Sequence, residues 1–332
     1  VLATAYYRMG KYDNAKLRFE RVVELKPNLQ EAILGVAMSD RESGDAQASL
    51  KKLEKILKEK PDWHPAIMEY GETLLALKQV ERAKEQFAKG VKMGSDAVAV
   101  QKRIARYYIE RKEFPEADKI FKKLIDSKDA DADVFVQFSE LMQAQSNHPA
   151  GLAVLKQGLK KFPENGYLHF RLGSYLASLQ RYKESLPEFK MALKLIPNSP
   201  VILQTYCIAQ AKAGSDDEAL DTANRLYALL PQDISTSILL ATRLTAVGQN
   251  KKAEDVYRKA LIIDPENTIV LNNIADLLAK NREFEEAEKL ARKLNTLTKN
   301  ENGTFLDTLG WILYRQDQFQ EAGFYHLSKY RG

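Results

Sequence analysis

Four histidines and one cysteine are the side chains in this sequence most suited to ligate a transition metal, transfer a proton near neutral pH or attack as a nucleophile. His64, His148, His169 and His326 are scattered, and none stands in an H-E-x-x-H or similar carboxylate spacing. Cys207 has no second cysteine to pair with, and no phosphate-cradling glycine loop or nucleophile elbow occurs. The sequence therefore predicts no enzyme activity, no catalytic residues, no metal and no cofactor.

A second group of residues is suited to recognition. The stretch "LDTLGWILYRQDQFQEA", residues 306–322, contains Asp307, Trp311, Tyr314 and Arg315. On a helix of 3.6 residues per turn these four side chains share one stripe. Aromatic rings in such a stripe are suitable platforms for stacking on a ligand. Whether the stripe binds anything depends on the elements that position it.

Composition narrows the class of protein. The chain has 332 residues, 45% of them hydrophobic, and no stretch approaches the roughly 18 consecutive apolar residues of a membrane span. Its net charge of +5 comes from 50 basic and 45 acidic residues spread evenly, which argues against nucleic acid or an anionic membrane as a partner. The single cysteine excludes an intrachain disulfide and leaves the redox compartment undetermined.

The first residues, "VLATAYYRMG", read as a helix already under way, and the first of them is valine. We expect a processed or excised fragment, with any signal peptide or lipid anchor outside it.

The prolines reveal a repeat. Six of the eleven prolines are separated by 34, 102, 34, 34 and 34 residues, and 102 is three times 34. They are Pro27, Pro61, Pro163, Pro197, Pro231 and Pro265. Within each period the apolar residues recur at helical spacing in two runs that short polar turns separate. Each period is therefore predicted to be a helix–turn–helix. After Pro197, the two helices are expected at about 200–212 and 217–229.

A second period is independent of proline. One position in each first helix is always small: Ala3, Ala37, Gly71, Ala105, Ser139, Gly173, Cys207, Ala241, Ala275 and Gly310. The partner position in each second helix is small as well: Ala15, Ser49, Ala83, Ala117, Gly151, Ser185, Ala219, Ala253, Ala287 and Ala322. Two antiparallel helices that cross closely leave no space there for a larger side chain.

This pattern resembles the tetratricopeptide repeat, and the resemblance covers essentially the whole chain. It implies an all-α, right-handed superhelical solenoid of antiparallel helix pairs, about ten units long, whose first helices line a concave groove. We expect a single solenoid over 1–332, with a partial first unit at 1–29, full units over 30–301 and a C-terminal unit at 302–332. In the last unit the register moves by one residue, because the linker "NTLTKNENGT" is one residue longer than its predecessors.

The expected groove has a polar and aromatic patch at its C-terminal end. Gly310 marks the helix crossing, so Leu306, Leu309 and Leu313 face the core and Trp311 lies outside it. The patch predicted to contact a partner comprises Asn272, Asn273, Asp276, Asp307, Trp311, Tyr314 and Arg315. Packing against a further terminal helix is an equally good explanation of these residues.

Two secondary groove candidates precede it. Lys102, Arg103 and Arg106 face inward, and the flanking acids Glu69, Glu72 and Glu140 favour structural charge pairing over an anion site. Tyr167, Phe170 and Arg171 cluster further along the chain. They could stack on a peptide, and packing against the adjoining helices explains the aromatic residues equally well.

The sequence of the last repeats is similar to that of bacterial envelope lipoproteins linked to exopolysaccharide production and exosortase sorting. The similar residues are "LNNIADLLAKNREFEEAEKLARKL" and the stretch after it. That resemblance implies a periplasmic or membrane-anchored setting. We therefore expect a non-catalytic scaffold that binds protein or peptide partners, among them polysaccharide-assembly components. The alternative is the substrate-recruiting arm of a larger glycosyltransferase or a polysaccharide-export porin, with Trp311 and Tyr314 stacking on sugar. Self-association through uncapped ends is a third hypothesis.

Overall fold

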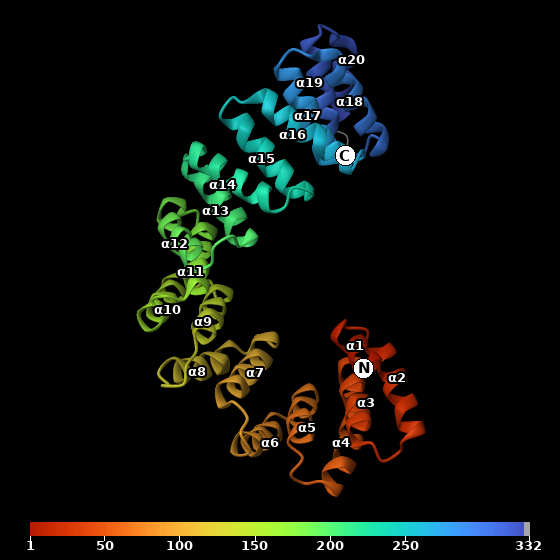
Figure 1. The fold of residues 1–332 in the computed structure, drawn as a ribbon, viewed down its shortest axis with the longest axis vertical. Coiled ribbons are helices and arrows are strands. Elements are labelled where there is room, and N and C mark those ends of the chain that lie inside the picture. Colours follow the sequence, from red (N-terminus) through yellow and green to blue (C-terminus); the bar gives the residue numbers. More distant parts are fainter. Residues whose placement is uncertain (329–332) are drawn as a thin grey trace. The chain divides into compact units, whose positions relative to one another are not determined.

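Every regular element in the described part of the chain is an α-helix. The computed structural model describes residues 1–328 and contains twenty helices there, arranged as antiparallel pairs. The predicted all-α class and helix-pair repeat are confirmed. The helices form two compact units, Val1–Gly151 and Leu152–Gly332, coloured red to yellow and green to blue in Figure 1.

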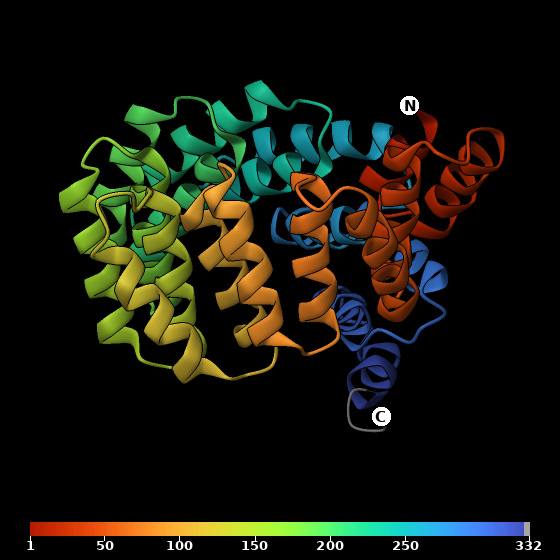
Figure 2. The ribbon, with the colours of Figure 1, turned by 90° about the horizontal axis from the view of Figure 1, so that it is seen from below.

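The first unit contains nine complete helices. They are α1 Leu2–Arg8, α2 Tyr12–Leu25, α3 Gln30–Glu42, α4 Ala46–Glu59, α5 His64–Ala76, α6 Val80–Lys92, α7 Ala97–Glu110, α8 Phe114–Ile125 and α9 Ala132–Ala144. Odd-numbered helices are the first helices of the repeats and even-numbered ones are the second. Figure 2 shows the helices of this unit side by side, joined by short turns. Helix α10, His148–Lys161, crosses the boundary between the units.

The second unit continues the same alternation. It contains α11 Gly166–Ser178, α12 Tyr182–Leu195, α13 Pro200–Ala213, α14 Asp216–Leu229, α15 Ile234–Ala246, α16 Asn250–Ile263, α17 Thr268–Lys280, α18 Phe284–Leu297, α19 Gly303–Arg315 and α20 Phe319–Ser328. The helices expected at 200–212 and 217–229 are α13 and α14, each within a residue of its prediction. Polar N-caps begin several first helices; the side chain of Asn165, for example, accepts a hydrogen bond from the Leu168 amide.

One left-handed residue closes the first helix of every repeat. The positive φ angles recur every 34 residues, at Gly10, Gly44, Lys78, Lys112, Ser146, Gln180, Gly214, Gly248 and Arg282. The last such residue is Asp317, which comes 35 residues after Arg282. This backbone conformation ends a helix and starts the tight turn to the next one. The expected one-residue shift of register in the last repeat is therefore present in the backbone.

Small residues at the crossings allow the paired helices to touch. Ala37, Ala105 and Cys207 are completely buried, and a Cβ atom added to Gly71 would lie 2.5 Å from the ring of Phe87. Phe87 follows the small residue Ala83 of its own second helix by four positions. The bulky side chain of one helix thus fills the space that the small residue of the other leaves.

Candidate partner-binding site

The C-terminal stripe lies on α19, and the helix buries its leucines as expected. Asn302 caps α19 by accepting hydrogen bonds from the amides of Thr304 and Phe305. Leu309 and Leu313 are almost completely buried, and Gly310 is buried beside them. Trp311 is only half-buried, but its ring packs against the edge of the core cluster instead of lying wholly outside it. An indole is large enough to reach the core from a position next to the crossing.

A hollow of about 610 Å³ opens between α19 and α20. It is lined by Asp307, Gly310, Trp311, Tyr314, Phe319, Ala322 and Gly323. The side chains of Tyr314 and Phe319 are 58% and 56% exposed, and their rings meet edge to face with centroids 5.4 Å apart. Three of the predicted residues, Asp307, Trp311 and Tyr314, therefore share one cavity. Phe319 was missed, although it stands at the start of the expected second helix of the last repeat.

Arg315 covers one face of the tryptophan. Its guanidinium carbon lies 5.1 Å from the centroid of Trp311 and 5.7 Å from that of Phe284 at the start of α18. Both distances are those of cation–π contacts. The arginine thereby holds the indole in place, and it leaves less of the ring available for a flat ligand.

The other three residues of the predicted patch are engaged elsewhere. Thr308 donates a hydrogen bond of 2.9 Å to the side-chain oxygen of Asn272. Asp276 forms an ion pair of 2.6 Å with Lys280 on its own helix. Asn273 lies near the Tyr257 hydroxyl; burial raises the pKa of that hydroxyl on balance, although Asn273 acts to lower it. The Thr308 bond ties α17 to α19, and none of the three residues lines the hollow between α19 and α20.

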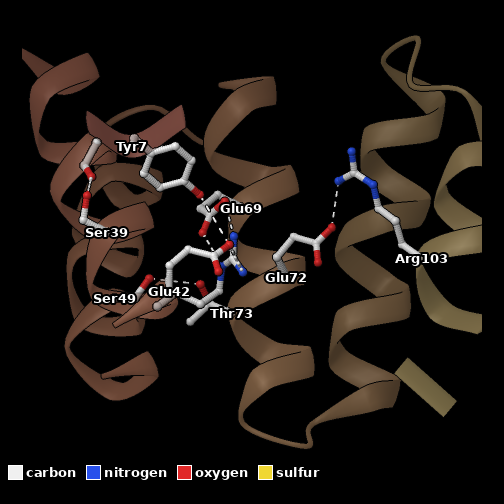
Figure 3. Close-up of polar contacts among 10 residues, drawn as sticks. Tyr7, Ser39, Glu42, Ser49, Glu69, Glu72, Thr73 and Arg103 are labelled. Carbon is white, nitrogen blue, oxygen red and sulfur yellow. Dashed lines mark hydrogen bonds and ion pairs between the residues drawn. The ribbon is translucent and has the colours of Figure 1, made fainter. Parts of the chain in front are cut away.

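The basic residues of α7 form ion pairs with neighbouring first helices. Lys102 lies 2.9 Å from both Asp131 and Asp133, at and near the N-terminus of α9. Arg103 is 2.7 Å from Glu72 of α5, as Figure 3 shows. Arg106 is exposed and lines a polar hollow of about 780 Å³ over α3, α5 and α7. The sequence had pointed to Glu140 and missed the two aspartates.

A charge cluster around the buried Glu69 lines part of this hollow. Arg41 of α3 is 2.6 Å from Glu69 of α5 and 3.0 Å from Glu42. Tyr7 of α1 donates a hydrogen bond of 3.4 Å to Glu42, so three successive first helices are linked (Figure 3). Burial raises the pKa of Tyr7 to about 12, against the opposite effect of Arg41. Arg41 was not predicted, although it is a basic residue on a first helix, as Arg103 is.

Comparison with known families decides what kind of repeat this is. A tetratricopeptide repeat model matches residues 141–200 and 238–300, and a second tetratricopeptide repeat model matches 1–29. The matched segments share the 34-residue recurrence of left-handed residues and the buried small crossings. The chain is a tetratricopeptide repeat protein.

Curated relatives are distant and longer. The chain is 20% identical over 221 residues to the anaphase-promoting complex subunit CDC16 of Saccharomyces cerevisiae, a match that covers 67% of this chain and 26% of that protein. It is 22% identical over 294 residues to the Hsp70-Hsp90 organizing protein 1 of Glycine max, covering 83% of this chain and 49% of the relative. The chain therefore spans half or less of each.

Among solved structures, this tetratricopeptide repeat chain is similar to PilW, described as a widely conserved type IV pilus biogenesis factor. The TM-score is 0.50 at 16% identity, and the likeness covers 59% of this chain and 91% of PilW. At this level of identity the likeness concerns the fold alone.

The three residues of the middle repeats, Tyr167, Phe170 and Arg171, differ in how far they are buried. Phe170 is half-buried and packs against the core, with its ring centroid 6.1 Å from that of Phe189. Tyr167 is 46% exposed, 6.3 Å from Phe170, and Arg171 is half-buried. Of the three, Tyr167 is the side chain with most surface available to a partner.

His64, His169 and Cys207 contact neighbouring residues within the fold. His169 contacts Glu188 at 2.7 Å and the carbonyl oxygen of Pro163 at 3.1 Å, and His64 contacts Ser95. Cys207 is completely buried, where its thiol donates to the carbonyl of Ala219. The side chain of His326 lies outside the described residues. Within the described part of the chain, no group of three or more His, Cys, Asp or Glu side chains is placed to hold a metal ion, and no helix has the length and apolarity needed to cross a membrane.

Proposed function

We propose that this tetratricopeptide repeat protein is a non-catalytic scaffold that binds protein or peptide partners, and that the hollow between α19 and α20 is one of its contact sites. The observation that carries the proposal is the pair of exposed rings, Tyr314 and Phe319, at a concave surface with Trp311 beside them. Exposed aromatic residues beside a concave surface are typical of partner-binding hot spots.

The ligand that suits this hollow is a peptide segment with one bulky apolar side chain. The lining is mostly aromatic or small, and such a side chain gains affinity by leaving water without requiring a polar partner. Stacking on sugar, the alternative mode, needs an open aromatic face. Arg315 occupies one face of Trp311, and Tyr314 packs edge to face with Phe319. This geometry favours peptide over sugar.

A peptide-library screen with the 332-residue chain tests the proposal. Tyr314→Ser is expected to weaken the selected aromatic peptides by about tenfold, equivalent to about 1.4 kcal/mol. Ile262→Ser is the matched control, because Ile262 is 81% exposed on α16 and does not line the hollow. Equal binding by both variants, or binding of oligosaccharides in a parallel glycan screen while no peptide is selected, would refute the proposed site.

The more specific setting, exopolysaccharide or envelope assembly, is part of the same proposal and rests on the texture of the C-terminal repeats. The full-length gene tests it. A signal peptide with a lipidated cysteine supports an envelope scaffold, whereas a downstream glycosyltransferase domain or a run of amphipathic strands supports the recruiting arm.

A further inference from the structure

A bridge between two fixed repeat positions joins the second helices of the last three repeats. Its first member stands five residues after the small crossing residue of one second helix, and its second member stands one residue before that of the next. Arg258 of α16 thus holds Glu286 of α18 at 2.8 and 2.9 Å. Arg292 of α18 holds Glu321 of α20 at 2.7 Å.

The same two positions are linked through a tyrosine in the first unit. Tyr70 of α5 donates a hydrogen bond of 3.2 Å to Glu54 of α4 and accepts one of 2.9 Å from Arg82 of α6. Glu54 and Arg82 are the first and second members of the bridge in their repeats.

No such bridge joins α6 and α8. The second position is alanine in two other repeats, at Ala48 and Ala150, whereas between α6 and α8 it is the first position that lacks a long side chain. The first position is a long or polar residue in eight of nine repeats and alanine in one: Glu20, Glu54, Ala88, Lys122, Lys156, Lys190, Asn224, Arg258 and Arg292. Ala88 is exposed and has no group that could reach across. The second member, Glu116, pairs instead with Lys119 of its own helix at 2.7 Å.

A hollow of about 600 Å³ lies where the bridge is missing. Phe87, Val100, Ile104 and Tyr108 contribute apolar surface from α6 and α7, and Ala88 stands at its edge. We call this hollow the Ala88 slot. Ala88 is the shortest residue of that series, so its side chain leaves the hollow open.

The rim of the Ala88 slot is basic on both sides. Lys84 and Lys92 stand on α6, Lys119 and Lys123 on α8, and Glu116 is the one acid among the lining residues. Lys84 already pairs with Glu81 at 2.8 Å, and Lys119 with Glu116, whereas Lys92 and Lys123 are exposed at the ends of their helices. Four lysines against one glutamate leave the rim with a net positive charge.

We propose that the Ala88 slot binds an acidic peptide segment and that one bulky apolar side chain of that segment inserts against Val100 and Ile104. Charge complementarity selects the occupant. Lysines on opposite sides of the slot require acidic groups before and after the anchor residue, which a peptide supplies. A fatty acid has a charged group at one end only and leaves the lysines of the other side unmatched.

The proposal is tested by fluorescence polarisation on the 332-residue chain. The probe is a short synthetic peptide with one Phe among Glu and Ala residues; its companions replace Phe by Ala, or every Glu by Lys. The Phe-containing acidic peptide is expected to bind at least about tenfold more tightly than either companion, and its affinity falls as salt is raised. Equal binding of the three peptides, or binding of dodecanoate with none of the acidic peptide, would overturn the proposal.

One substitution closes the slot without removing any native contact. Ala88→Arg places at position 88 the residue that already pairs with an acid in α16 and α18, so the chain should fold and Glu116 gain a partner. We expect peptide affinity to fall about tenfold or more. Asn224→Arg is the matched control, with the same new side chain at the equivalent position of α14. A second variant, Lys123→Glu, reverses one rim charge and should weaken binding severalfold at low salt. Unchanged peptide affinity in Ala88→Arg, with Ala88→Arg and Asn224→Arg melting like the parent chain, contradicts the inference.

Discussion

The guanidinium of Arg41 lies 2.6 Å from the carboxylate of Glu69, and this pair joins the first helices of two neighbouring repeats. Glu69 is only 7% exposed. A charge buried to this extent requires its partner, because the carboxylate has lost most of its water. The pair therefore fixes how α3 and α5 sit against each other.

Loss of the Arg41 charge should destabilise the first unit. Arg41→Met leaves the buried Glu69 carboxylate uncompensated, and we expect a loss of about 2–3 kcal/mol in the free energy of unfolding. Arg103→Met is the control, since Arg103 is 47% exposed in its pair with Glu72 and should cost no more than about 1 kcal/mol. Urea denaturation measures both, and equal costs would mean that burial of the Arg41 pair is unimportant.

Cys207 should make stability fall at high pH. Burial raises the pKa of its thiol from 9.0 to about 11. Between these values the unfolded chain has released the proton that the folded chain still holds. The unfolded state then binds fewer protons, so stability falls as pH rises through this window, by no more than about 3 kcal/mol.

Denaturation of the parent chain and of Cys207→Ala between pH 8 and pH 11 checks this slope, which follows from the raised pKa. The variant should lack that part of the decline. Alkylation provides a second reading, because the buried thiol should react with iodoacetamide only after unfolding. Rapid alkylation of the native chain would contradict the burial.

The left-handed turn residues predict opposite effects of glycine and alanine. Gly214 has φ of 83°, and Gly214→Ala should cost about 1 kcal/mol because a Cβ atom is strained there. Lys112 has φ of 60°, so Lys112→Gly removes such strain and should raise the free energy of unfolding by about 0.5 kcal/mol. Thermal melting of the two variants gives the signs, and a gain from Gly214→Ala would show that the turn is not left-handed in solution.

Substitutions of Trp311 and Tyr314 should both weaken peptide binding but should differ in their effect on stability. Trp311 is half-buried against the core, so Trp311→Ala should cost about 2 kcal/mol as well as weakening aromatic peptides. Tyr314 is 58% exposed, and Tyr314→Ser should change stability by less than about 0.5 kcal/mol while weakening the same peptides. Differential scanning calorimetry measures the first effect. A large loss of stability in Tyr314→Ser would make that residue part of the packing and not of a binding site.

Local features of the sequence determined the repeat. The 34-residue spacing of prolines, the small residues at every crossing and the longer linker before the last repeat are all properties of one stretch of chain. They act through sterics between helices adjacent in sequence, as Gly71 and Phe87 do. The shifted register of the last repeat, with its left-handed residue at Asp317, could therefore be predicted without coordinates.

Tertiary structure alone decided which side chains meet. Lys102 was expected beside glutamates and lies beside Asp131 and Asp133, while Asn272 pairs with Thr308 instead of facing a ligand. The cavity at Trp311 depends on Phe319 of the next helix, and the Ala88 slot is lined by residues of three helices, α6, α7 and α8. Long polar side chains have many rotamers and several partners within reach. Their choice is made by the geometry of neighbouring helices, which periodicity does not specify.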